Sequence, residues 1–397
     1  MVLRRGRGTR LVVSVLTAAA ALALAAWLYL ATLHGRFWRA DQRLDPAPPA
    51  PAAWPEIVAV IPARDEADVV GRAVASLLAQ DYPGTVSVVL VDDRSTDGTA
   101  EAARNAAGGD TRLTVVLAPP LGPGWTGKLW AMNAGLARAL ALRPTARFVL
   151  LTDADIAHER SALARLVAKA EAERRDLVSL MVKLHCVGVW ERLLIPAFVF
   201  FFQKLYPFPR VNDPRNRTAG AAGGCMLVRR TALERIGGLT PIKSELIDDC
   251  ALARAIKPGG SIWLGLAEAS ASLRPYEGLG GIWRMVARTA FTQLRFSALL
   301  LAGTVLGMAV LYAAPPVAAV AGFISGYGMT AALGGVGWLL MAALYRPTGR
   351  LYGRPAWDAA LLPVAALLYL LMTLSSALAH WRGRGGAWKG RTYGHPT

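Results

Sequence analysis

The sequence predicts an α/β domain with a largely parallel, doubly wound sheet, placed between membrane helices at the two ends of the chain. Three observations support this prediction. Residues 56–260 alternate strand-like and helix-like segments, residues 11–33 contain no charged side chain, and residues 298–380 are again mostly apolar. Because 54% of the 397 residues are hydrophobic and only 18% are charged, the chain is too apolar for a purely soluble protein.

Residues 1–44 are predicted to form an N-terminal membrane anchor. The apolar run 11–33 has 23 residues, which would extend about 34 Å as a helix and so cross a hydrocarbon core. A cleaved signal peptide is the alternative, since Arg4 and Arg5 precede the run. We favour the uncleaved anchor because the run is longer than a signal core and ends in bulky residues. A Pro/Ala linker, 45–55, follows.

The C-terminal apolar block is predicted to contain three membrane helices, the first of them kinked at Pro315-Pro316. The expected spans are 298–322, 327–345 and 357–379. A basic loop at 346–354 favours a cytoplasmic position between the last two spans, but the basic tail 381–397 would then face outward. The charges therefore leave the number and orientation of the spans open.

The net charge of +17 indicates anionic lipid head groups as a partner rather than nucleic acid. The arginines concentrate beside the apolar segments, and the sequence carries no nucleic-acid-binding motif. Cys186, Cys225 and Cys250 lack the spacing of a disulfide framework or a zinc site. We therefore expect a multi-pass protein of a bacterial-type inner membrane, with its central domain facing the cytoplasm.

Within residues 56–260, predicted strands and helices alternate, and this alternation favours a parallel sheet. The first helix carries an apolar face that includes Val70, Val74 and Leu77. The second runs to about residue 107, with side chains of residues 95–97 as candidate caps. A third helix is expected at about 128–142. The expected strands are 57–61, 86–91, 113–117 and 147–152.

Three acidic pairs stand out in this basic chain: Asp92-Asp93, Asp153-x-Asp155 and Asp248-Asp249. The first two follow predicted strands, and open α/β sheets bind ligands at the carboxyl ends of their strands. The first pair could accept hydrogen bonds from a base or ribose, or form a turn that caps the next helix. On an extended chain the side chains of the second pair point the same way and could share a divalent cation. The third could cap a helix.

These pairs occur within a longer series of motifs. The series is Ile61-Pro-Ala-Arg-Asp-Glu66, Val91-Asp-Asp-Arg-Ser-Thr-Asp-Gly-Thr99, Gly124-Trp-Thr-Gly-Lys-Leu-Trp-Ala-Met-Asn-Ala-Gly135, Thr152-Asp-Ala-Asp155 and Asp248-Asp249. In order, spacing and strand-end placement it resembles the family 2 glycosyltransferases of the GT-A fold. The resemblance covers about 56–300 and implies a catalytic domain at 56–297. With its membrane segments, the whole chain is similar to the hopanoid-biosynthesis-associated membrane glycosyltransferases and, more distantly, to ceramide glucosyltransferase.

The resemblance implies a nucleotide site after the first two strands. It assigns Ala63, Arg64 and Glu66 to the nucleotide pocket, and either Asp92 or Asp93 to the uracil ring. For Asp92 and Asp93, the structural alternative remains a polar turn at the end of the strand.

The resemblance also implies a site for the donor diphosphate. Lys128 would offset the diphosphate charge, although an exposed lysine at a helix start is the plainer reading. Asp155, assisted by Asp153, would hold Mg²⁺ or Mn²⁺ against the diphosphate. The Q/R-x-x-R-W motif of processive relatives is not present with correct spacing, which argues against processive polysaccharide synthesis.

On the acceptor side, the resemblance implies that Asp249 is the catalytic base, with Asp248 in place of the family's Glu. Two adjacent carboxylates disfavour joint ionisation, so at least one pKa should be raised toward useful base strength. Gly220, Gly223 and Gly224 would let an acceptor approach the backbone closely, although a glycine-rich turn before a strand is an equally good explanation.

The implied function is inverting transfer of a sugar from a nucleotide-sugar, with UDP as the expected nucleotide, to a lipid acceptor such as a hopanoid. The apolar run 193–202 either lies in the membrane interface near that acceptor or is buried in the core of the domain. A nucleotidyltransferase on a similar fold and a non-catalytic membrane scaffold are the alternatives.

Overall fold

The computed structural model describes residues 7–383, 387–388 and 391–392, so Arg4, Arg5 and much of the basic tail lie outside the described residues. The chain divides into two compact units. The sheet unit contains Asp41–His185 and Phe208–Pro275. The helical unit contains residues 7–40, 186–207 and 276–383. The expected catalytic domain 56–297 therefore contributes to both units.

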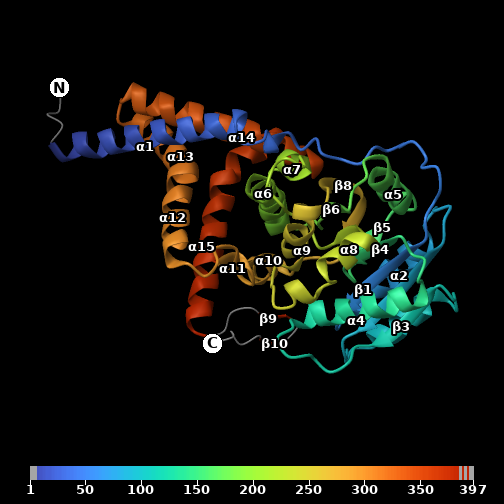
Figure 1. The fold of residues 1–397 in the computed structure, drawn as a ribbon. Helices are drawn as coiled ribbons and strands as arrows, with labels where there is room; N and C mark the ends of the chain where they lie inside the picture. Colours follow the sequence, from blue (N-terminus) through green and yellow to red (C-terminus); the bar gives the residue numbers. More distant parts are fainter. Residues whose placement is uncertain (1–6, 384–386, 389–390, 393–397) are drawn as a thin grey trace. The chain divides into compact units, whose positions relative to one another are not determined.

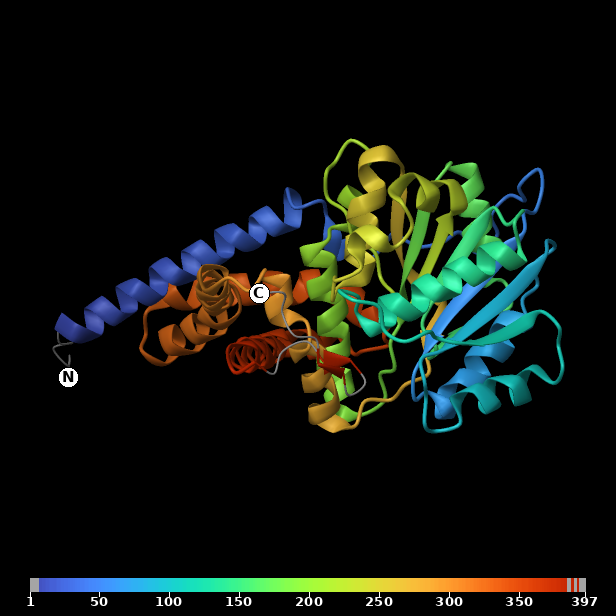
Figure 2. The ribbon, with the colours of Figure 1, turned by 60° about the horizontal axis from the view of Figure 1, so that its bottom comes forward.

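The sheet unit is built on eight strands in the order β3-β2-β1-β4-β7-β6-β8-β5 (Figures 1 and 2). The four predicted strands are confirmed as neighbouring parallel strands. They are β1 (Ile57–Ala63), β2 (Val86–Asp92), β3 (Leu113–Leu117) and β4 (Phe148–Thr152).

The first half of the sheet is parallel, as expected, and the second half is mixed, with one parallel pairing and three antiparallel ones. β7 (Cys225–Arg229) runs antiparallel between β4 and β6 (Leu177–Lys183). β5 (Ile156–His158) lies at the edge, antiparallel to β8 (Ile262–Ser272). A buried strand is apolar whichever way it runs, so its composition does not reveal its direction. A separate antiparallel pair joins β9 (Ala387–Trp388) to β10 (Arg391–Thr392).

Helices cover both faces of the sheet, which explains why the central strands are continuously hydrophobic. The predicted apolar face of the first helix packs through Val70, Val74 and Leu77 on the alternate side chains of β1. On the opposite face, a Cβ added at Gly135 would lie 2.5 Å from Val60, so a glycine is needed for the close approach of helix and strand. The helices are α2 (Ala67–Leu78), α3 (Thr99–Ala107), α4 (Gly127–Leu142), α5 (Ala162–Ala172), α7 (Phe208–Asn212), α8 (Arg230–Ile236) and α9 (Asp248–Ile256).

The helical unit contains four stretches that are long and apolar enough to cross a membrane. They are Leu11–Thr32, Ala298–Ile324, Gly328–Leu351 and Ala356–Trp381. These match the four predicted spans, but the basic loop expected at 346–354 starts later, because α14 (Gly328–Leu351) continues through Arg346 and Pro347. Arg354 instead pairs with Asp358 in the following turn.

A π-helical turn interrupts the span that contains Pro315-Pro316, as the predicted kink required. α12 (Ala298–Met308) and α13 (Ala314–Ile324) flank the turn Ala309–Ala313, where the chain changes direction (Figure 1). Pro315 has no N–H to donate to the carbonyl of Leu311 four residues earlier. Trp27 of α1 (Arg7–Thr32) satisfies that carbonyl, with its indole N–H 2.8 Å away.

The apolar run 193–202 lies in α6 (Val189–Leu205), inside the helical unit. Leu194 and Phe200 of this run are buried, as is the next α6 residue, Gln203, whose amide donates to Thr348 of α14 at 3.1 Å. The run therefore does not belong to the core of the sheet unit, which was one of the two expectations. The other helices of this unit are α10 (Gly278–Ala287), α11 (Ala290–Gln293) and α15 (Leu362–Trp381), with 3-10 turns at Phe37–Arg39 and Ala356–Leu361.

Candidate active site

The candidate site lies at the carboxyl edge of the parallel strands. Ala63 and Asp92 are paired in register at the ends of β1 and β2, and Asp153 directly follows β4. The N–H of Asp93 donates to the carbonyl of Ala63 at 2.8 Å, which keeps the two strand ends together. The sequence therefore brings its first two acidic pairs to one edge of the sheet, as predicted.

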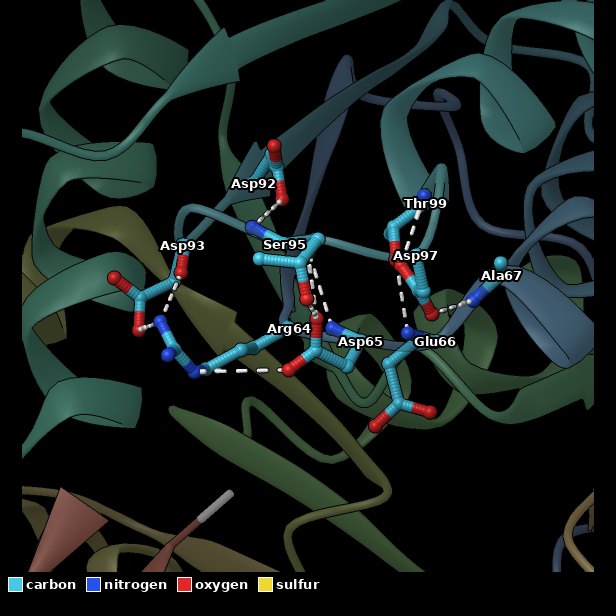
Figure 3. A network of polar contacts seen from close by, with 10 residues as sticks. Arg64, Asp65, Glu66, Ala67, Asp92, Asp93, Ser95, Asp97 and Thr99 are labelled. Atoms are coloured by element: carbon cyan, nitrogen blue, oxygen red, sulfur yellow. Dashed lines mark hydrogen bonds and ion pairs between the residues drawn. The ribbon is translucent and has the colours of Figure 1, made fainter. Parts of the chain in front are cut away.

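The loops that follow β1 and β2 are joined by hydrogen bonds (Figure 3). The N–H of Asp65 donates to Ser95 Oγ at 3.0 Å, and Asp65 Oδ1 accepts from the N–H of Thr96 at 2.9 Å. The N–H of Ala67 donates to Asp97 Oδ2 at 2.9 Å. Asp65 has a φ of 50°, which is unfavourable for a residue with a side chain. These bonds hold the loop in that conformation, so its shape is fixed before any ligand binds.

Asp92 and Asp93 occupy different surroundings. Asp93 is buried, and Arg64 holds it with Nη1 at 2.6 Å from its carbonyl and 3.7 Å from its carboxylate. Asp92 is partly exposed, and its Oδ1 accepts from the N–H of Ser95 at 3.0 Å. Asp93 thus connects the two loops, while the carboxylate of Asp92 is more accessible from solvent. The N-cap position of α3 is Gly98 rather than one of residues 95–97. Asp97 still contributes at this end of the helix, because its Oδ1 accepts from the N–H of Thr99 at 3.0 Å.

Lys128, at the start of α4, joins the second and third acidic pairs. Its Nζ lies 2.8 Å from Asp153 Oδ1 and 3.1 Å from Asp248 Oδ2. Burial disfavours the ammonium, but the carboxylates of Asp153 and Asp248 outweigh that effect and hold the pKa of Lys128 above its usual range. Lys128 therefore stays charged, and the plainer reading as an exposed lysine does not hold, since its side chain is only 23% exposed.

Asp249 is held at the start of α9 by two backbone N–H groups. Gly223 donates to Oδ2 at 2.9 Å, and Cys250 donates to Oδ1 at 2.6 Å. Burial, followed by repulsion from Asp248, raises the pKa of Asp249 to about 6, although Lys128 and the two N–H groups oppose the shift. A carboxyl with this pKa is ionised at neutral pH and has a strength suited to general-base catalysis.

The three glycines before β7 differ in their surroundings. A Cβ at Gly223 would lie 3.4 Å from Lys128 Nζ and 3.6 Å from Asp249 Oδ2, so this glycine borders the space between the two charged groups. A Cβ at Gly224 would lie 2.9 Å from Val182, which gives that glycine a packing role. Gly220 is buried in the same loop.

Arg274 is the site residue that sequence reasoning missed. It follows β8, and its guanidinium pairs with Glu66 and, through Nε at 3.3 Å, with Asp155 Oδ2. The hydroxyl of Ser272 also donates to Asp155 Oδ2 at 3.3 Å. Arg274 carries the same signal as the first two acidic pairs, namely a charged residue that follows a strand. It could not be recognised because the strand 262–272 was not predicted.

The donor chemistry of Asp153 and Asp155 fits a hard divalent cation that shares its ligands with a phosphate. Among the described residues, no group of three or more His, Cys, Asp or Glu side chains is arranged to hold a metal ion by itself. Mg²⁺ sites of enzymes that act on phosphates commonly use one or two carboxylates and complete their coordination with phosphate oxygens and water. Two carboxylates one residue apart, beside a lysine, match that type of site.

The fold is an α/β domain of the GT-A type, with two acidic pairs at the carboxyl edge of its parallel strands and a separate buried carboxyl at the start of α9. Residues 58–237 match the family described as glycosyl transferase family 2. This part of the chain belongs to that family and forms a glycosyltransferase domain.

Two curated relatives from Rhizobium meliloti (strain 1021) are similar to parts of this chain. Succinoglycan biosynthesis protein ExoO is 35% identical over 166 residues, covering 38% of this chain and 44% of that protein. Succinoglycan biosynthesis protein ExoU is 46% identical over 65 residues, covering 16% and 18%. The chain thus spans less than half the length of either relative.

The fold extends over nearly the whole chain in one solved structure, a mannosyltransferase, PcManGT, from Pyrobaculum calidifontis in complex with GDP-Man and Mn²⁺. The likeness covers 91% of this chain and 99% of that one, with a TM-score of 0.57 and 23% identity. At this identity the comparison establishes the shared fold.

Proposed function

We propose that this protein is a membrane-anchored inverting glycosyltransferase that moves a sugar from a nucleotide-sugar to a lipid acceptor. The observation that carries the proposal is the position of Asp249. Its carboxylate has a raised pKa and borders, across Gly223, a lysine that contacts the Asp153 carboxylate. A base on one side and a cation for phosphate on the other are the parts that a direct displacement requires.

In the proposed reaction, Asp249 takes the proton of the acceptor hydroxyl as that oxygen forms a bond to the anomeric carbon. The bond from the anomeric carbon to the phosphate oxygen breaks, and the nucleoside diphosphate leaves with the electron pair. The attack and the departure take place on opposite sides of the sugar, so the anomeric configuration inverts. The backbone N–H groups of Gly223 and Cys250 orient the carboxylate for this step.

Lys128 is the side chain that stabilises the negative charge developing on the departing diphosphate. It remains protonated in the site, and its Nζ already contacts Asp153 and Asp248. Asp153 and Asp155 would hold a Mg²⁺ or Mn²⁺ ion, which would supply further charge neutralisation to the diphosphate.

We propose that Asp92, rather than Asp93, contacts the nucleoside base, because Asp93 is buried and already engaged by Arg64. A carboxylate accepts readily from the N–H of a uracil ring, so a UDP-sugar is the proposed donor. Ala63, Arg64 and Glu66 would shape the pocket around it.

A lipid acceptor is proposed because four helices of the chain are long and apolar enough to cross a membrane. An acceptor that reaches the enzyme from the bilayer would explain their presence beside a glycosyltransferase domain. A hopanoid is the lipid class that the sequence resemblance favours, with the domain on the cytoplasmic side, where nucleotide-sugars are available.

Two labels on the donor test the reaction class. The full-length protein in lipid vesicles is incubated with UDP-glucose and related UDP-sugars, labelled either in the sugar or in the uracil, together with lipid extract from its own organism. We expect the sugar label, and not the uracil label, to enter the lipid fraction. Entry of the uracil label would establish nucleotidyl transfer instead, and entry of neither label with any donor would support the scaffold alternative.

The acceptor is tested by comparing lipid extracts of a deletion strain and its parent by mass spectrometry. We expect one glycosylated lipid to disappear from the deletion strain and to return on complementation. Its mass would identify the sugar and the acceptor. An unchanged hopanoid profile beside the loss of another glycolipid would reject the hopanoid assignment while keeping the reaction.

A further inference from the structure

Arg274 holds together two carboxylates that belong to different parts of the candidate site. Its guanidinium pairs with Glu66, in the loop after β1, and with Asp155, in the motif after β4. The proposed nucleotide pocket and the proposed cation site are thus linked by a single side chain. Nothing in the proposed reaction so far uses this residue.

The charges around Arg274 are unbalanced. In the described site, two cations, Lys128 and Arg274, face five carboxylates. These carboxylates belong to Glu66, Asp153, Asp155, Asp248 and Asp249. An anionic diphosphate would be repelled by this excess unless positive charge is directed toward it.

Arg274 is also the most accessible member of its cluster. Its side chain is 40% exposed, whereas those of Glu66 and Asp155 are 11% and 20% exposed. A guanidinium offers several N–H donors in a planar fork, which suits the oxygens of a phosphate as well as those of a carboxylate. It can therefore pair with either kind of partner.

We propose that Arg274 is a donor-binding residue that occupies the carboxylates of the empty site and turns to the diphosphate when the donor binds. In the empty site, its charge competes with a divalent cation for Asp155. In the loaded site, Asp155 is released to that cation, and Arg274 pairs with the diphosphate beside Lys128. The inference rests on the proposed function, because it requires a nucleoside diphosphate in this site.

The exchange predicts opposite effects on two affinities, which a purely structural role would not produce. Loss of the guanidinium removes a competitor of the divalent cation, so Arg274→Ala should bind Mn²⁺ alone about three to ten times more tightly. The same change removes a charge-assisted hydrogen bond to the diphosphate, so UDP in saturating Mn²⁺ should bind about 10 to 100 times more weakly. Arg274→Lys keeps the charge without the fork and should give intermediate values.

The experiment uses the full-length protein in detergent. Mn²⁺ binding without nucleotide is followed by the electron paramagnetic resonance signal of the free ion, and UDP binding in saturating Mn²⁺ by calorimetry. Arg160→Ala is the matched control, because it removes the same charge from a surface pair with Asp81 in the same unit. This control should leave both affinities unchanged.

The inference is overturned if Arg274→Ala weakens both affinities, leaves both unchanged or changes only one of them. A fall in melting temperature together with weaker binding of both ligands would show that Arg274 has a structural role only. A wild-type protein that binds neither UDP nor GDP in the presence of Mn²⁺ would instead reject the proposed function, and the inference with it. The two failures are therefore distinguishable.

Discussion

Replacement of Asp248 by Asn should move the acid limb of the pH–rate profile to lower pH. Asp248 is the neighbouring like charge that raises the pKa of Asp249, and it also shares the Lys128 ammonium. Asp248→Asn removes the repulsion. It also removes one of the carboxylates that share the Lys128 ammonium, so the positive charge of Lys128 acts more strongly on Asp249. Both changes favour the ionised carboxylate, so the pKa of Asp249 should fall from about 6 toward its ordinary value of 3.8.

The sign and the size of this effect follow from the role of Asp249 as a base. The ionised form is the active one, so the wild-type kcat/KM should be nearly constant above pH 7 and fall about tenfold per pH unit well below pH 6. The difference between about 6 and 3.8 corresponds to about 3 kcal/mol against the ionised form. At pH 5 the wild type should keep roughly a tenth of its activity, and the variant a larger share of its own maximum.

The assay is the initial rate of sugar transfer between pH 4.5 and 8, with each enzyme normalised to its own plateau. The midpoint is the readout, because the loss of Asp248 is also expected to lower the plateau. Asp81→Asn, which removes a surface carboxylate paired with Arg160, should leave the midpoint in place. An unchanged or raised midpoint in Asp248→Asn would refute the electrostatic reasoning.

Three further predictions concern the fold and the edges of the site. Gly223→Ala should change the free energy of unfolding by less than about 1 kcal/mol but lower sugar transfer at least about tenfold, because the added methyl group enters the space beside the base. Gly224→Ala places its methyl group against a neighbouring strand, so it should cost about 1–3 kcal/mol in the free energy of unfolding. Arg64→Ala should lower the free energy of unfolding by about 1–3 kcal/mol and weaken UDP binding, because it removes the partner of the buried Asp93. The stability and the UDP affinity are measured on the same preparation. Burial lowers the pKa of His158 to about 4, so the stability of the wild type should fall by up to about 3 kcal/mol as the pH drops from 6.5 to 4. His158→Gln should not show this loss in pH-dependent melting curves, and equal pH dependence in both proteins would refute the prediction.

The first half of the sheet could be predicted because it obeys local rules. Its strands are short apolar runs, and β1, β2 and β3 are each followed by a helix, as β1 is by the amphipathic α2. Such a β/α succession determines parallel pairing and brings the strand ends to one edge. The acidic residues at the ends of β2 and β4 therefore lie at the same edge of the sheet, as expected.

The second half could not be predicted in the same way. β7 lies between β4 and β6 and runs against both, and this arrangement depends on contacts between segments far apart in the sequence. The role of Arg274 has the same origin, since it reaches Glu66 across 208 positions of the chain. The bulky run 193–202 shows a related limit, because its composition did not reveal which unit would bury it.

The four long apolar helices could be located by length and composition alone, while their internal details depended on packing. Pro315 predicted a break in the helix, but only the structure shows Trp27 at the carbonyl that the proline leaves without a donor. The continuation of α14 through Pro347 was missed, because a proline and several arginines usually indicate a loop. Buried Thr348 and Gly349 lie in that extra turn.

The central claim is that Asp249 removes the proton of the acceptor hydroxyl. The most direct test measures sugar transfer and UDP binding on the same preparation of Asp249→Asn, which keeps the size of the side chain. The account predicts that transfer falls by about 10²- to 10⁴-fold while the UDP affinity in saturating Mn²⁺ stays within about twofold of the wild type. Transfer by Asp249→Asn at the wild-type rate would contradict the account.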